Sequence, residues 1–100
     1  MTADVARFLL ERAADELDRL AADPAAPDDR AARAVRHARG RHEVARTWLR
    51  LAATGDELLA PRLAELGRVL CLLAAAYEDH PDFPALAERS PLLRSGFPLW

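Results

Sequence analysis

The chain is 100 residues long and contains 14 Arg, no Lys and 16 acidic residues, which give a formal net charge of −2. A chain of this length buries about 65% of its unfolded surface, which is enough for one hydrophobic core and excludes two domains. It has 22 Ala and 17 Leu against only four Val, three Thr and no Ile. This composition disfavours a sheet and predicts an all-α fold.

The first predicted helix covers residues 3–22, with Thr2 as its N-cap. Apolar side chains recur from Val5 to Leu20 at the spacing of one helical face. Asp23 precedes Pro24, and a residue before proline is pushed out of the α region. We therefore expect the helix to end there and a linker to follow over residues 23–27.

The second predicted helix covers residues 28–53. It begins near Asp28, whose carboxylate is favoured at the positive end of the helix dipole. Gly40 interrupts its apolar stripe, so the helix either bends there or lets another helix come close. Gly55 is a plausible C-cap.

The third predicted helix covers residues 57–80. Thr54 and Glu57 have the spacing of a capping box, and Asp56 is a rival N-cap. Pro61 predicts either an irregular first turn or a start close to Ala60. Beyond it, apolar residues in a four-three repeat and on a second face indicate a helix buried on most sides. The repeat is formed by Leu59, Leu63, Leu66, Leu70, Leu73 and Tyr77.

Residues 81–100 form an apolar tail interrupted by prolines, with room only for a short helix near 85–89 capped by Asp82. The tail is too apolar to remain in water, so it packs on the helices or docks on a partner. The predicted fold is therefore a small three-helix bundle with an apolar, proline-punctuated C-terminal tail.

Self-association is the function that this arrangement favours. Two amphipathic helices cover only part of the third, so a second copy or another protein would bury the remainder. We predict a non-enzymatic protein-interaction module that forms a homodimer. The predicted interface consists of Val69, Leu72, Leu73, Tyr77, Phe83, Phe97 and Trp100.

Residues 30–50 contain seven Arg and one acid, so this segment carries +6 and the rest of the chain −8. We interpret the arginines as paired, inside a bundle or across a dimer, with acids of the first helix (Glu11, Asp15, Glu16, Asp18) and of the third. The alternative is a nucleic-acid-associated regulator, although the sequence pI of about 5.9 is low for that class. In that alternative the anion contacts are Arg33, Arg36, Arg39, Arg41 and Arg46.

The segment from Tyr77 to Phe83 is dense in titratable groups. Asp79, His80 and Asp82 have the residue types of a metal or acid–base cluster. Pro81 favours the simpler interpretation of a helix stop. His37 and His42 lie five residues apart, which does not place them on one helix face as a metal pair. We predict no catalytic, cofactor-binding or metal-binding residue.

Cys71 is the only cysteine, so no internal disulfide forms and a reducing cytoplasm fits best. The longest run without a charge is far shorter than the roughly 20 residues that span a bilayer, and no signal peptide is evident. We expect a cytoplasmic protein with no membrane partner.

The Tyr77–Phe83 string follows a leucine-rich helix, residues 68–76, near the end of the chain. In this it resembles an uncharacterised actinobacterial family of small helical proteins, whose members carry Tyr-x-Asp-His-Pro-Asp and an aromatic residue there. Residues 5–12 are similar to the family's first helix and residues 33–51 to its basic middle helix, which covers about two thirds of the chain. The resemblance implies a helical fold and no established activity.

Overall fold

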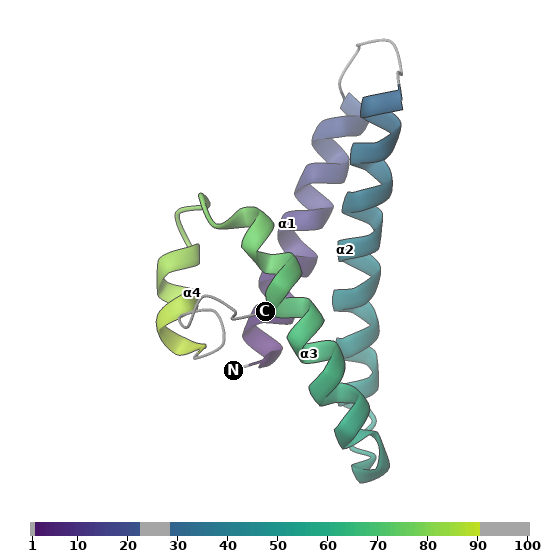
Figure 1. Ribbon diagram of the computed structural model, residues 1–100, viewed down its shortest axis with the longest axis vertical. Helices are drawn as coiled ribbons and strands as arrows, with labels where there is room; N and C mark the ends of the chain where they lie inside the picture. Colours follow the sequence, from purple (N-terminus) through teal and green to yellow (C-terminus); the bar gives the residue numbers. More distant parts are fainter. Residues whose placement is uncertain (1, 23–28, 91–100) are drawn as a thin grey trace, which may run out of the picture.

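The computed structural model describes residues 2–22 and 29–90 and is all-α, as the composition predicts (Figure 1). These ranges contain four α-helices and two short 3₁₀ turns and no strand. The elements are α1 (Thr2–Ala22), α2 (Asp29–Ala53), η1 (Glu57–Leu59), α3 (Ala60–Ala74), η2 (Ala75–Tyr77) and α4 (Phe83–Arg89).

Helices α1 and α2 form a long antiparallel hairpin (Figure 1). Four alanines of this hairpin are completely buried, Ala6 and Ala13 on α1 and Ala38 and Ala45 on α2. On each helix the two alanines lie seven residues apart, which is two turns, so both members of each pair point the same way. Side chains this small allow close packing along the helix face that bears them.

Helix α3 lies across the lower half of the hairpin in Figure 1. Its Leu70 and Cys71 are buried in one cluster with Val5 and Leu9 of α1. Nε1–H of Trp48 on α2 donates a hydrogen bond to the carbonyl oxygen of Leu63, at 3.0 Å. These contacts fix α3 on both helices of the hairpin.

Gly67 is a position on α3 where the start of α1 lies close to the backbone. A Cβ at this position would lie 3.2 Å from Cγ2 of Thr2, which is the first residue of α1. Gly67 therefore permits an approach that a larger side chain would hinder. At Gly40, by contrast, no other element among residues 2–22 and 29–90 has an atom within 4 Å of the position of a Cβ, so none of their helices packs closely there.

The start of α3 is irregular. Gly55 adopts a left-handed conformation with φ of +67°, which favours glycine and ends α2. Oδ1 of Asp56 accepts a hydrogen bond from the backbone N–H of Leu58 at 2.9 Å, so Asp56 rather than Thr54 caps the 3₁₀ turn η1. Helix α3 begins at Ala60, with Pro61 in its first turn, where a missing N–H costs no helical hydrogen bond.

The predicted third helix over 57–80 is thus divided, because η1 precedes α3 and η2 follows it. The chain then turns at residues 78–82 and enters α4, which starts at Phe83, two residues before the predicted short helix. Asp82 occupies its N-cap position, but its side chain makes no capping hydrogen bond. Leu86 of α4 is buried in the core cluster. The remainder of the predicted tail, residues 91–100, lies outside the described residues.

Phe8 joins α1 to the segment that follows α3. Its ring meets three other rings edge-on, with centroid distances of 6.5 Å to Tyr77, 5.6 Å to His80 and 6.1 Å to Phe83. Edge-to-face aromatic contacts of this length are favourable beyond the burial of their surface. The turn at 78–82 is therefore held against α1.

None of the helices in the described ranges has the length and apolar character needed to cross a membrane.

We expect Ala38→Leu to lower the free energy of unfolding by about 1–3 kcal/mol, because a larger side chain at this fully buried position forces the packed helices to shift. The matched control is Ala32→Leu on the same helix, where the side chain is exposed. Urea unfolding of both variants measures the difference. Equal stability of the two variants would contradict close packing at Ala38.

Candidate functional site

Charged side chains of α1 and α2 meet η2 and the turn that follows it in a cleft. It has a volume of about 400 Å³, within the range of small-molecule sites. A second cavity, of about 280 Å³ between α1 and α4, is also lined by five charged residues, but only two of them are arginines, Arg7 and Arg89. The residues that line it are Arg12, Asp15, Glu16, Arg19, Arg41, Ala76, Tyr77 and His80.

One half of the cleft joins three elements through Glu16. The hydroxyl of Tyr77, in η2, donates a hydrogen bond to Oε2 of Glu16 at 2.5 Å. Nη1 of Arg41, on α2, lies 3.3 Å from the same oxygen and 3.4 Å from the Tyr77 hydroxyl. The Arg41 guanidinium also lies 5.5 Å from the centroid of the Tyr77 ring, a cation–π distance. Glu16 therefore binds α1 to both α2 and η2.

This environment changes the acidity of Tyr77. Burial and the hydrogen bond to Glu16 raise the pKa of its hydroxyl to about 12, although Arg41 opposes the increase. Burial disfavours a charged phenolate, and a nearby carboxylate repels one. Tyr77 is thus a neutral donor at physiological pH.

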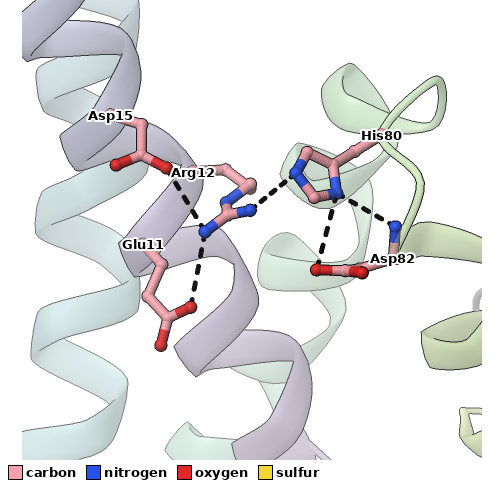
Figure 2. A network of polar contacts seen from close by, with 5 residues as sticks. All are labelled: Glu11, Arg12, Asp15, His80 and Asp82. Carbon is pink, nitrogen blue, oxygen red and sulfur yellow. Dashed lines mark hydrogen bonds and ion pairs between the residues drawn. The ribbon is translucent and has the colours of Figure 1, made fainter.

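The other half of the cleft is centred on Arg12 (Figure 2). Its Nη1 lies 2.6 Å from Nε2 of His80, and its Nη2 lies 3.3 Å from Asp15 and 3.5 Å from Glu11. The Arg12 side chain is 19% exposed, whereas both carboxylates are about two-thirds exposed. Nε of Arg12 is buried with no hydrogen-bond partner among the described residues. Arg12 is therefore a largely buried cation whose donors are incompletely used.

His80 faces a donor on each side of its ring. Nε2 faces the Arg12 guanidinium, and Nδ1 lies 3.0 Å from the backbone nitrogen of Asp82. A neutral imidazole has only one acceptor nitrogen, so it satisfies one of these donors at a time. Nδ1 also lies 3.8 Å from the Asp82 carboxylate, so the tautomer that accepts from Arg12 directs its N–H toward an anion (Figure 2).

Asp79, His80 and Asp82, the residues of the predicted alternative of a metal or acid–base cluster, do not face a common point. His80 is directed toward Arg12, and Asp79 and Asp82 are both exposed. Within residues 2–22 and 29–90, no three His, Cys, Asp or Glu side chains come together in a manner that could hold a metal ion. The turn itself is formed by backbone hydrogen bonds from His80 to Tyr77 and from Phe83 to His80.

The five arginines of the predicted anion-binding face are in three different environments. Arg33, Arg36 and Arg39 are exposed, and no ion pair joins them to an acid in the described ranges. Arg46 pairs with Glu43 at 3.6 Å. Arg41 lies inside the cleft and pairs with Glu16 of α1. Among these five arginines, it is the only one for which the described residues show an ion pair with an acid of α1.

The seven residues of the predicted interface differ in their exposure and in whether the structure describes them. Val69 and Leu72 are exposed on α3. Leu73, Tyr77 and Phe83 are partly buried and pack against the core of their own chain, so they offer less surface to a partner. Phe97 and Trp100 lie outside the described residues.

Sequence reasoning did not single out Arg12 and Arg19 as members of a site, and it assigned Glu16 only to general charge pairing. One signal was available. Phe8, Arg12 and Glu16 form a row with four-residue spacing beside the apolar stripe of α1. Charged side chains in such a row lie at the border of the core. The partners of Arg12 and Glu16 are Arg41, Tyr77 and His80. These residues come from distant segments, so local spacing does not indicate the contacts.

Comparison with known proteins yields no match to a family model, a curated protein or a solved structure. The resemblance of the Tyr77–Phe83 string to the actinobacterial family stays a prediction.

Alkaline titration tests the cleft directly, because Tyr77 is the only tyrosine in the chain. We expect its phenolate absorbance to appear with a pKa of about 12 in the folded protein, against 10 for the unperturbed side chain. Because the folded state holds this proton more tightly, its contribution to stability is complete below pH 10 and is lost as the pH rises toward 12.

Glu16→Gln removes the charge beside Tyr77, so the pKa of Tyr77 should fall toward its ordinary value in this variant. The control is Glu43→Gln, which removes an acid that pairs with Arg46 outside the cleft. A wild-type titration near pH 10, or equal pKa values in the two variants, would contradict the described contacts of Tyr77.

Proposed function

We propose that this chain is a non-enzymatic interaction module that self-associates as a homodimer through one face of η1 and α3. The observation that carries the proposal is the exposure of apolar side chains there. Leu58 is 88% exposed, Val69 39% and Leu72 36%. These are the large hydrophobic residues that the described part of the chain leaves in solvent.

These residues and two charged residues have the sequence spacing of one helical stripe, which starts at Leu58 in η1 and continues along α3. Leu58, Arg62, Glu65, Val69 and Leu72 follow one another at steps of four, three, four and three residues. This is the spacing of the contact positions in paired helices. All five are exposed, and neither Arg62 nor Glu65 belongs to an ion pair in the described ranges. We call these five residues the α3 stripe.

The α3 stripe is complementary to itself in an antiparallel arrangement. If the two-fold axis passes between Arg62 and Glu65, each Arg62 faces Glu65 of the second copy, and the reverse contact forms as well. Leu58 lies four residues before Arg62, and Val69 lies four residues after Glu65. In this register Leu58 therefore faces Val69 of the second copy. Two apolar contacts would flank two opposite-charge contacts.

A second copy is the occupant that this charge pattern favours. An unrelated partner would need its own complementary sequence, whereas a two-fold axis pairs Arg62 with Glu65 without any further requirement. A single helix pair buries less than the roughly 1,200–2,000 Å² of a standard interface, so we expect a weak dimer. In this proposal α1, α2 and α3 act as a three-helix bundle that presents the stripe, and residues 81–100 form the tail. Phe97 and Trp100 remain predicted interface residues.

The charge pattern predicts the behaviour of reversal variants. Arg62→Glu should weaken the dimer at least about tenfold, because each dimer then contains two like-charge contacts with Glu65. The double variant Arg62→Glu with Glu65→Arg restores opposite charges and should dimerise as wild type does. Sedimentation velocity over a concentration series measures the masses, between 11.0 kDa and about twice that value.

Arg68→Glu is the matched control, because Arg68 is an exposed arginine of α3 outside the α3 stripe. It should leave the dimer unchanged. An equal effect of Arg62→Glu and Arg68→Glu, or failure of the double variant to recover, would contradict the proposed register.

Nucleic-acid binding is the second candidate function, and the exposure of Arg33, Arg36 and Arg39 without acidic partners in the described ranges favours it. Guanidinium groups that contact phosphates release counterions, so affinity falls as salt increases. Wild type should shift on duplex DNA at about 50 mM salt, and replacing the three arginines by Gln should reduce the salt slope by about three. Absence of binding at low salt would exclude this candidate.

A further inference from the structure

The cleft between α1, α2 and η2 contains more cationic donors than its own acids use. Three arginines line it, Arg12, Arg19 and Arg41, against two acids, Asp15 and Glu16. The formal charge of the lining is therefore +1 with His80 neutral. The Tyr77 hydroxyl and the imidazole of His80 add two further polar groups. Such convergence of donors in a concave site is typical of anion recognition.

The pairings of Arg41 and Arg19 with Glu16 are long, and each involves a single nitrogen of the guanidinium group. The distance from Arg41 to Glu16 is 3.3 Å, and that from Arg19 to Glu16 is 4.0 Å. A strong charge-assisted hydrogen bond is about 2.7–2.9 Å long, and a guanidinium commonly makes two of them to one anion. Arg19 is also 75% exposed at the edge of the cleft, so its side chain is available to a ligand.

The carboxylate of Glu16 is an oxyanion that the cleft already surrounds with donors. Its carboxylate is 19% exposed and lies between the hydroxyl of Tyr77 and two guanidinium groups. The other two arginines, Arg12 and Arg19, lie two turns apart on the same face of α1. The Nη atoms of Arg12 already face His80, Asp15 and Glu11, whereas the Arg19 side chain is largely in solvent. A ligand held by both must offer acceptor oxygens in several directions.

We propose that this cleft binds a small molecule through a phosphate group. A phosphate presents tetrahedrally arranged oxygens and up to two negative charges, whereas a carboxylate presents two oxygens in one plane with one charge. A phosphate therefore fits better between planar guanidinium groups that approach from two helices. A volume of about 400 Å³ accommodates a phosphate with a small organic group attached. The site shares no residue with the α3 stripe, so it does not rest on the proposed dimer.

The test is titration of the full chain with inorganic phosphate at constant ionic strength, followed by the backbone amide signals in NMR spectra. Signals of residues that line the cleft should shift together and saturate. Arg19→Gln should weaken binding at least about fivefold, since it removes a charged donor from an exposed position. Arg50→Gln is the control, because Arg50 is an exposed arginine of α2 that neither lines the cleft nor belongs to the predicted anion-binding face.

Two results would overturn the proposal. Equal weakening by Arg19→Gln and Arg50→Gln, or amide shifts that never saturate, would show a general attraction of anions to the surface. Succinate, a dianion with two carboxylates, should bind at least about fivefold more weakly than phosphate. If succinate binds as tightly, the cleft does not select a phosphate group.

Discussion

The contact of Phe8 with the aromatic residues that follow α3 is the interaction on which the arrangement of the molecule depends. Its ring is 9% exposed and touches Tyr77, His80 and Phe83 edge-on. This packing turns the chain back toward α1 after α3, and it brings the Tyr77 hydroxyl to Glu16 and the His80 ring to Arg12. It also holds α3 with its core face toward the hairpin, so the opposite face remains in solvent. Loss of this ring would therefore disturb the cleft as well as the core.

The helices were predictable because their signals are local. The spacing of apolar residues, the prolines and Gly55 place the boundaries of α1 and α2 within one position, because each of these signals acts on its immediate neighbours. The third helix was predicted less well, since α3 ends six residues before position 80. The choice between Thr54 and Asp56 as the cap could not be made from spacing, since both side chains can accept a backbone N–H. Oγ1 of Thr54 instead donates to the carbonyl of Leu51 and accepts from the N–H of Asp56, which leaves the capping of η1 to Asp56.

The candidate site was less predictable because its members come from three separate segments. The sequence identified the charge contrast between the first two helices, and the Glu16–Arg41 pair is an instance of it. It did not identify Arg12 as the partner of His80, because the residues are 68 positions apart and their contact depends on how the chain turns after α3. For the same reason, the positions of α1 and α2 decide which apolar side chains between residues 58 and 77 are buried in the core and which are exposed. Periodicity alone does not distinguish Leu72 from Leu73.

The central claim is that two copies pair through the α3 stripe, and disulfide trapping tests it most directly. In the proposed register Leu58 faces Val69 of the second copy, whereas the two Leu58 side chains lie about 16 Å apart, eleven residues along paired helices. A mixture of Leu58→Cys and Val69→Cys chains should therefore form a covalent heterodimer under mild oxidation, and Leu58→Cys alone should remain monomeric. The native Cys71 is 1% exposed, so it does not compete. Equal cross-linking of Leu58→Cys alone, or no cross-linking of the mixture, would contradict the account.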